Sequence, residues 1–151
     1  MSVIFLSIYV MGSGGCASGQ RSQRDSSIHL GKSLFEIRCA ACHELDGTGV
    51  AGGGPPLVGS SWVSGPEFRI IRIVLQGVRG PITVNGETYN REMIGFGSVA
   101  TDDELAALLT YVRRRWGGIE DMVEAASVRK IRTATEGKIG YWTVEELLDI
   151  P

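Results

Sequence analysis

Cysteine and histidine are scarce in this chain of 151 residues, which contains three Cys and two His. A structural zinc site usually takes four ligands of these types, so it would have to use nearly all of them. The formal net charge is only −2, and the chain therefore lacks the strong basic excess of a nucleic-acid-binding protein. Hydrophobic residues make up 43% of the chain, enough for one globular domain with its own core. Several arginines could still form a local basic patch or a solvated helix face: residues 69, 72, 79, 113, 114 and 115.

A long apolar run is also missing from the N-terminus. Residues 3–11 are largely apolar, but a transmembrane helix needs about 20 such residues, whereas the hydrophobic region of a signal peptide needs about 7–15. Small residues follow as far as Cys16, and this arrangement resembles a bacterial lipoprotein signal, which is cleaved before a cysteine that then carries lipid. We therefore predict a signal peptide over residues 1–16, with Cys16 either lipidated or a free thiol. The polar residues 17–27 are predicted to form a flexible tether.

The other two cysteines belong to the motif Cys39-Ala-Ala-Cys42-His43. C-x-x-C-H is typical of covalent attachment of a c-type haem, because the two thiols can add to the haem vinyl groups while the adjacent imidazole ligates the iron. A redox-active C-x-x-C would instead follow a strand and precede a helix. Here the apolar residues within 30–37 have helical spacing, and a Gly-rich loop follows the motif. The motif occurs once, so we predict one haem c with its iron, and electron transfer is the first function to consider.

The periodicity of apolar residues predicts a mostly helical fold. The expected helices cover about residues 29–41, 66–77, 101–116 and 119–134, with a short last helix after Thr143. Thr101 and Glu104 form a capping box at the start of the third helix, which has a strongly amphipathic pattern. Residues 82–89 are predicted to form a small β-hairpin with a tight turn at Asn85-Gly86.

Gly31 and Phe35 precede Cys39 at intervals of four residues, and Leu108 and Tyr111 form an apolar–aromatic pair near the end of the predicted domain. Together with the C-x-x-C-H motif, these residues resemble the pattern of class I cytochromes c. In that family the small Gly lets the N-terminal and C-terminal helices cross closely, and the aromatic residue packs at the crossing.

This resemblance extends from about residue 28 to residue 116 and implies a fold and a domain organisation. The fold would be all-α, a class I cytochrome c fold around one covalent haem, with a small β-hairpin. The cytochrome c domain would cover residues 28–118, and a helical C-terminal extension would cover residues 119–151. Residues 141–148 also resemble the tails of bacterial cytochromes that accompany periplasmic dehydrogenases. We expect this tail to pack back over the domain, and docking on a larger complex is the alternative.

The same resemblance implies the ligands of the haem iron. The segment Gly54-Pro55-x-Leu57 is similar to one in which the Pro carbonyl accepts a hydrogen bond from the axial His, so Pro55 would orient His43 and raise its basicity as a ligand. The family takes its sixth ligand from a Met before the last helix, which here implies Met93. Relatives with a similar insertion usually have Pro soon after this Met, whereas this chain has Met-Ile-Gly-Phe and leaves the loop less constrained.

The sequence contains other candidate ligands and several candidate walls of the haem pocket. Met122 is a weaker candidate for the sixth ligand because it is expected to fill the core. His29 is also a weaker candidate because it stands at the start of the first predicted helix. The expected apolar walls include Leu57, Trp62 and Phe96, together with core-facing residues of the second and third helices. Each of these could equally be plain core. His/Met ligation and an apolar pocket both favour ferrous iron and raise the reduction potential.

The sequence therefore predicts an exported single-haem cytochrome c that carries electrons and has no catalytic residue. Its expected partners are redox proteins such as a dehydrogenase, a quinol-oxidising complex or a terminal oxidase, and no nucleic acid is expected. It would act on the periplasmic side of the membrane, where lipid at Cys16 would anchor it. One alternative is a cytochrome subunit of a respiratory or dehydrogenase complex. Another is a haem enzyme or gas sensor with an open sixth position, favoured only by the missing Pro after Met93.

Overall fold

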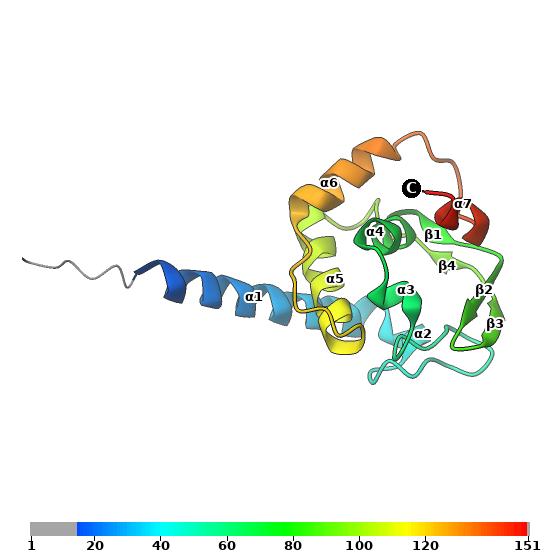
Figure 1. Cartoon of the computed structure of the whole chain (residues 1–151), viewed down its shortest axis with the longest axis horizontal. Coiled ribbons are helices and arrows are strands. Elements are labelled where there is room, and N and C mark those ends of the chain that lie inside the picture. The colour runs from blue at the N-terminus through cyan, green and yellow to red at the C-terminus, as the bar shows by residue number, and fades with distance from the viewer. Residues whose placement is uncertain (1–14, 151) are drawn as a thin grey trace, which may run out of the picture.

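The computed structural model describes residues 15–150, which form seven helices and two small two-stranded sheets, and the β2–β3 hairpin lies at one edge of the domain (Figure 1). This arrangement confirms the predicted all-α fold with a small hairpin. In chain order the elements are α1 (Gly15–Arg38), α2 (Ala40–His43), α3 (Ser61–Ser64), α4 (Glu67–Gln76), β1 (Gly77–Val78), β2 (Pro81–Val84), β3 (Glu87–Asn90), β4 (Met93–Ile94), α5 (Asp102–Trp116), α6 (Ala125–Ala134) and α7 (Val144–Leu148).

Helices α1 and α5 cross closely because Gly31 has no side chain. A Cβ atom at Gly31 would lie only 2.1 Å from the carbonyl oxygen of Ala107. One turn further along α1, the Phe35 ring lies 4.7 Å from the Trp116 ring and 5.9 Å from the Tyr111 ring, measured between centroids. The small and aromatic residues singled out in the sequence therefore meet at one helix crossing.

The first helix is much longer than predicted, because α1 begins at Gly15 rather than near residue 29. Residues 17–27, predicted to be a flexible tether, are thus helical, and this prediction was wrong. Their side chains from residue 19 to residue 26 are exposed, so polarity indicated a linker, but no proline interrupts the helix. Once the packed half of α1 has formed, each added residue gains a backbone hydrogen bond without a new nucleation cost. The hydroxyl of Ser26 also donates to the carbonyl of Ser22 (2.9 Å).

The predicted signal peptide, residues 1–16, lies almost entirely outside the described residues, and so does the side chain of Cys16. Both therefore stay predictions. Among the helices within residues 15–150, none has both the length and the apolar character needed to cross a bilayer.

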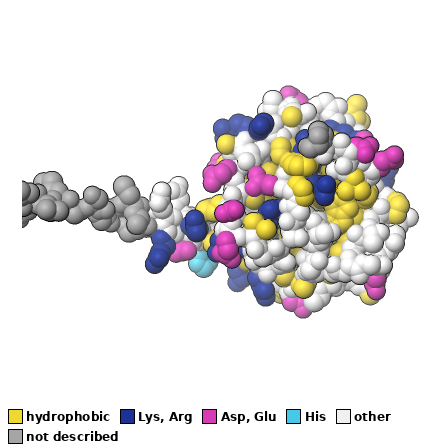
Figure 2. Space-filling view, viewed as in Figure 1, with side chains coloured by type: hydrophobic (Ala, Val, Ile, Leu, Met, Phe, Trp, Pro, Cys, Tyr) yellow, Lys and Arg dark blue, Asp and Glu magenta, His cyan; other side chains and the backbone are white. Residues whose placement is uncertain are grey.

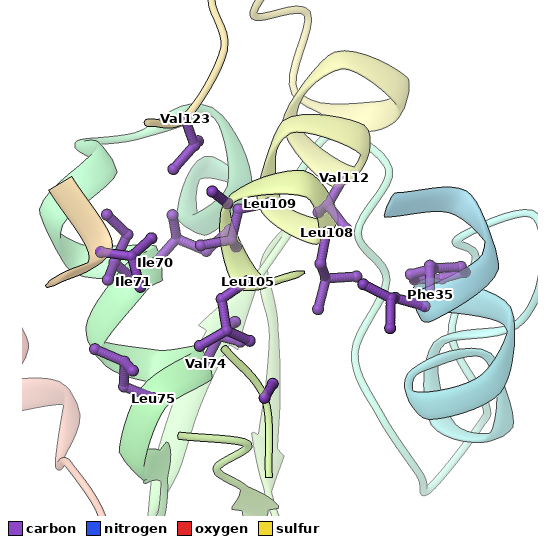
Figure 3. Packing of buried hydrophobic residues seen from close by; sticks show 14 of the residues in the cluster. Phe35, Ile70, Ile71, Val74, Leu75, Leu105, Leu108, Leu109, Val112 and Val123 are labelled. Carbon is purple, nitrogen blue, oxygen red and sulfur yellow. The ribbon is translucent and has the colours of Figure 1, made fainter. Parts of the chain in front are cut away.

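The hydrophobic core lies between α5 and the helices that flank it. Figure 3 shows Leu105, Leu108 and Leu109 of α5 between the side chains of α4 and Phe35 of α1. The amphipathic pattern of α5, with its capping box at Thr101, is confirmed. Several residues that the sequence allowed either as pocket walls or as core belong to this buried cluster: Ile71, Val74, Leu75, Leu105 and Leu108.

The two sheets differ in how well the sequence indicates them. The β2–β3 hairpin was predicted, and its turn residues Asn85 and Gly86 both have positive φ angles (52° and 86°), as a type I′ turn requires. The sheet of β1 and β4 was not predicted. It pairs Val78 with Met93 and Gly77 with Ile94, and strands of two residues are too short to show an alternating pattern.

The C-terminal extension packs back over the domain, as expected. Val128 of α6 is 0% exposed within the main core, and Leu147 of α7 is buried beside Ile73 and Val78 in a second cluster. Helix α6 starts later than predicted because residues 117–124 form a connection whose Val123 amide donates to the Thr110 hydroxyl (2.9 Å). The tail thus covers its own domain with buried apolar side chains.

Candidate haem site

The C-x-x-C-H motif comprises Cys39, which is the N-cap residue of the short helix α2, and the four residues of α2 itself, directly after α1. The Cys39 amide donates to the carbonyl of Phe35 (2.9 Å), and the amides of Cys42 and His43 donate to the Cys39 carbonyl (3.1 and 3.0 Å). One helical turn thus presents both sulfur atoms and the imidazole. Both cysteines are free thiols, with Cys39 half-buried against the core and Cys42 exposed.

The environment of Cys39 argues against a redox-active dithiol. Burial raises the pKa of the Cys39 thiol to about 11, whereas a reactive C-x-x-C thiol has a lowered pKa. The motif also follows a helix rather than a strand. A zinc site is equally poorly supported, since no cluster of three His, Cys, Asp or Glu side chains suited to a metal ion occurs within residues 15–150.

His43 is held by a hydrogen bond of the kind that the family resemblance implied. Its Nδ1 lies 2.8 Å from the carbonyl oxygen of Pro55, and since a carbonyl can only accept, Nδ1 must donate. The second ring nitrogen, Nε2, is then left to accept or to bind a metal ion. Burial lowers the pKa of His43, while the hydrogen bond to Pro55 acts in the opposite direction. The net result favours the neutral imidazole, which is the form that ligates iron.

Glycines let the loop after the motif fold back against it. A Cβ atom at Gly54 would lie 2.5 Å from the Cys42 carbonyl oxygen, so only glycine fits where the loop passes the motif just before Pro55. A Cβ atom at Gly47, which has a φ of +78°, would similarly lie 2.4 Å from an atom of the Trp116 ring, so glycine leaves room for that ring. The Trp116 indole N–H also donates to the carbonyl of Asp46 (2.7 Å). The amino-acid sequence does not predict this anchoring role of Trp116, because nothing local to α5 indicates contact with a loop 70 residues earlier.

Met93 lies on β4, half-buried, and contacts both hydrophobic clusters. Cys39 contacts the larger of these clusters, so both residues border the same apolar region. His29 is exposed on α1, ten residues before Cys39 and thus about 15 Å along the helix axis. Met122 is half-buried in the connection before α6. Met93 as the sixth ligand stays a prediction, which these placements favour over the two alternatives.

The predicted pocket residues are likewise half-buried rather than fully enclosed. Leu57 and Phe96 contact the larger cluster, and Trp62 contacts the smaller one. The Trp62 indole N–H donates to the Thr83 carbonyl (3.0 Å), and the Arg69 guanidinium lies 5.5 Å from the centre of its ring. Their contact with a cofactor stays a prediction.

Two of the arginines that could have joined a basic patch make contacts of their own. Arg113 is 6% exposed and donates to the carbonyls of Val63 (3.1 Å) and Gly65 (2.9 Å), so it ties α5 to α3 from inside the domain. Arg114 pairs with Glu120. In Figure 2 basic and acidic side chains are interspersed over the face shown, and hydrophobic side chains gather between them.

Taken together, the residues fit a covalently attached haem. Two free thiols stand at the spacing of the attachment motif, and a buried imidazole has one nitrogen fixed by Pro55 and the other free. Half-buried apolar side chains, including Met93, border the same region.

Comparisons with known proteins agree with this fit. The cytochrome c family model matches residues 28–116. Cytochrome c-552 of Thermus thermophilus is 33% identical over 105 residues, which cover 63% of this chain and 79% of that protein.

Cytochrome subunits of larger enzymes are similar as well. The cytochrome c subunit of the quinone-dependent alcohol dehydrogenase of Gluconobacter oxydans (strain 621H) is 31% identical over 108 residues, covering 70% of this chain and 22% of that subunit. The cbb3-type cytochrome c oxidase subunit FixP of Sinorhizobium medicae (strain WSM419) is 34% identical over 89 residues, covering 57% of this chain and 29% of that subunit. The chain therefore belongs to the cytochrome c family, whose members transfer electrons through a covalently bound haem c and its iron.

Proposed function

We propose that this protein is an exported single-haem electron carrier. In this proposal Cys39 and Cys42 hold the haem through thioether bonds, and His43 and Met93 ligate its iron. The observation that carries the proposal is the hydrogen bond of 2.8 Å from His43 Nδ1 to the Pro55 carbonyl, which fixes the ring with Nε2 free. A hydrogen-bonded imidazole is a better-oriented and more basic ligand than a free one.

The thiols need no oxidant for attachment. Each Cys S–H adds across a vinyl C=C bond, so that sulfur bonds to one carbon and hydrogen to the other. The helical turn of α2 holds the two sulfur atoms next to the imidazole, and the exposure of Cys42 leaves it accessible during attachment.

Haem c, once bound, supplies reversible one-electron chemistry at its iron. In this proposal His43 and Met93 would both hold the iron, and the protein would thereby keep oxygen and peroxide from binding it. The half-buried side chains of Leu57, Trp62 and Phe96 would exclude water and disfavour the more highly charged ferric state. Both effects favour a carrier over a haem enzyme or a gas sensor.

The protein would act on the periplasmic side of the membrane, after export directed by residues 1–16 and with lipid at Cys16 as its anchor. Its partners would be redox proteins, such as a dehydrogenase, a quinol-oxidising complex or a terminal oxidase. The relatives include a cytochrome c-552 as well as cytochrome subunits of larger enzymes. We favour the separate carrier because the tail buries Val128 and Leu147 against its own domain, which leaves these side chains unavailable for docking.

Optical spectra test this proposal directly. The protein, produced with the c-type maturation machinery, should be low-spin, should show the methionine-to-ferric-iron charge-transfer band, and should not shift when carbon monoxide is added. The Met93→Ala variant should keep its covalent haem, lose the band, bind carbon monoxide and have a lower reduction potential. A high-spin wild-type spectrum that shifts with carbon monoxide would instead support the haem enzyme or gas sensor. The Met122→Ala variant is the control and should behave as wild type.

A further inference from the structure

The segment that follows Met93 is attached to the rest of the domain by backbone contacts rather than by proline. The Phe96 amide donates to the Val74 carbonyl (2.8 Å), and the Gly97 amide donates to the Leu75 carbonyl (3.0 Å). A Cβ atom at Gly97 would lie 2.7 Å from the same Leu75 oxygen. The end of α4 thus holds one side of the segment.

The C-terminal extension holds the other side. Arg132 of α6 donates to the carbonyl oxygens of Gly97 and Ala100, the latter at 3.0 Å, and its Nε lies 2.8 Å from a carboxylate oxygen of Asp102. One guanidinium thereby joins the Met93 segment to the first turn of α5. The side chains of Arg132 and Asp102 are only 32% and 18% exposed, so water competes weakly for these bonds.

The extension also reaches the strand that pairs with Met93. The Trp142 amide donates to the Gly77 carbonyl (3.0 Å), and the Arg79 amide donates to the Trp142 carbonyl (2.8 Å). Val78 therefore lies between Trp142 on one side and Met93 on the other. Figure 1 shows α6 and the segment leading to α7 wrapped around α4 and β1.

We propose that the C-terminal extension positions Met93 for the iron, and that Arg132 is the positioning residue. The inference rests on Met93 being the sixth ligand. Proline after the ligand would restrict the backbone of this segment, and here the three contacts of Arg132 supply the restriction from outside it. The extension would then tune the strength of the bond between the iron and the Met93 sulfur through the backbone that follows Met93.

Arg129 provides a matched control on the same helix. It also pairs with Asp102, at 3.2 Å, but it makes no hydrogen bond to Gly97 or Ala100, and its side chain is 66% exposed. Arg132→Ala and Arg129→Ala therefore remove the same charge from α6, and only the first frees the Met93 segment.

The experiment measures how fast imidazole displaces the methionine from the ferric, haem-loaded protein. Arg132→Ala should speed imidazole binding by about tenfold or more, the scale of one charge-assisted hydrogen bond. It should also weaken the charge-transfer band. Arg129→Ala should stay within about twofold of wild type, as an exposed pair would. Arg132→Lys keeps the positive charge but lacks the planar guanidinium that donates to several acceptors at once. Its rate of imidazole binding should therefore fall between those of Arg132→Ala and Arg129→Ala.

The outcomes separate the two proposals. A wild-type protein without the charge-transfer band, or a Met93→Ala variant that keeps it, would overturn the ligand assignment and this inference with it. If Met93→Ala loses the band while Arg132→Ala binds imidazole at the rate of Arg129→Ala, only the positioning role is overturned. If Arg132 were important only for global stability, Arg132→Ala would lower the urea midpoint of unfolding and leave the rate of imidazole binding unchanged. If Arg132→Ala does not retain haem, the rate of imidazole binding to Arg132→Lys is the test instead. A rate equal to that of Arg129→Ala would then overturn the positioning role of Arg132.

Discussion

Replacing Gly31 with alanine should force α1 and α5 apart. The added Cβ atom would lie 2.1 Å from the Ala107 carbonyl oxygen and 2.8 Å from Cβ of Tyr111. Carbon and oxygen normally approach no closer than about 3.3 Å, so the helices would have to separate by about 1 Å. The nearest atom belongs to the backbone of α5, so it cannot rotate away as a flexible side chain would. Separation would also loosen the contact of Phe35 with Trp116.

Two opposing terms decide the size of the effect. Alanine is better than glycine inside a helix by about 1 kcal/mol, which favours the variant. Overpacking costs about 1–3 kcal/mol, and a rigid backbone neighbour puts this site at or above the upper end of that range. We therefore expect Gly31→Ala to lower the free energy of unfolding by about 2 kcal/mol.

Urea unfolding of the haem-loaded protein, followed by circular dichroism, measures this change. Gly19→Ala is the matched control, because Gly19 lies on the same helix and a Cβ atom there would meet nothing within 4 Å. That variant should be as stable as wild type or slightly more so, since it gains helix propensity without a clash. If Gly31→Ala unfolds at the same urea concentration as Gly19→Ala, the close crossing does not limit the packing, and the reasoning fails.

Two further predictions concern the loop that follows the C-x-x-C-H motif and the start of α5. Gly54→Ala would place a Cβ atom 2.5 Å from the Cys42 carbonyl oxygen, so the yield of covalent haem, measured as pyridine haemochrome, should fall. Gly137→Ala, which meets nothing within 4 Å, should leave that yield unchanged, and equal yields in both variants would contradict the prediction. Hydrogen bonds from the Thr101 backbone amide and hydroxyl hold the pKa of the Glu104 carboxyl below its ordinary value. This pairing stabilises the fold above the unfolded-state pKa of about 4.3 and is lost as the pH falls through the lower folded-state pKa. Urea unfolding at pH 7 and pH 3 should therefore show a smaller acid-induced loss for Glu104→Gln than for wild type, and equal losses would refute this role.

Local signals in the sequence were enough to predict several parts of the molecule. The capping box at Thr101 and the turn at Asn85-Gly86 each depend on residues only a few positions apart in the sequence, and the structure has both. The family resemblance added the crossing at Gly31, which the contact with Ala107 explains. The beginning of α1 was predicted wrongly, because polar composition indicates exposure and does not by itself forbid a helix.

The sequence by itself determined the haem attachment motif, because its chemistry needs two thiols and an imidazole within one helical turn. Only the tertiary structure decided which backbone carbonyl oxygens Arg113 and Arg132 bind. Arg113 has the same local context as its two neighbours, yet it is buried against the carbonyls of residues about 50 positions earlier. Arg132 reaches carbonyls 32 and 35 positions away, at Ala100 and Gly97. Backbone carbonyls are present at every residue, so no sequence pattern identifies which of them a distant guanidinium will find, and only the packing of α6 against α5 selects them.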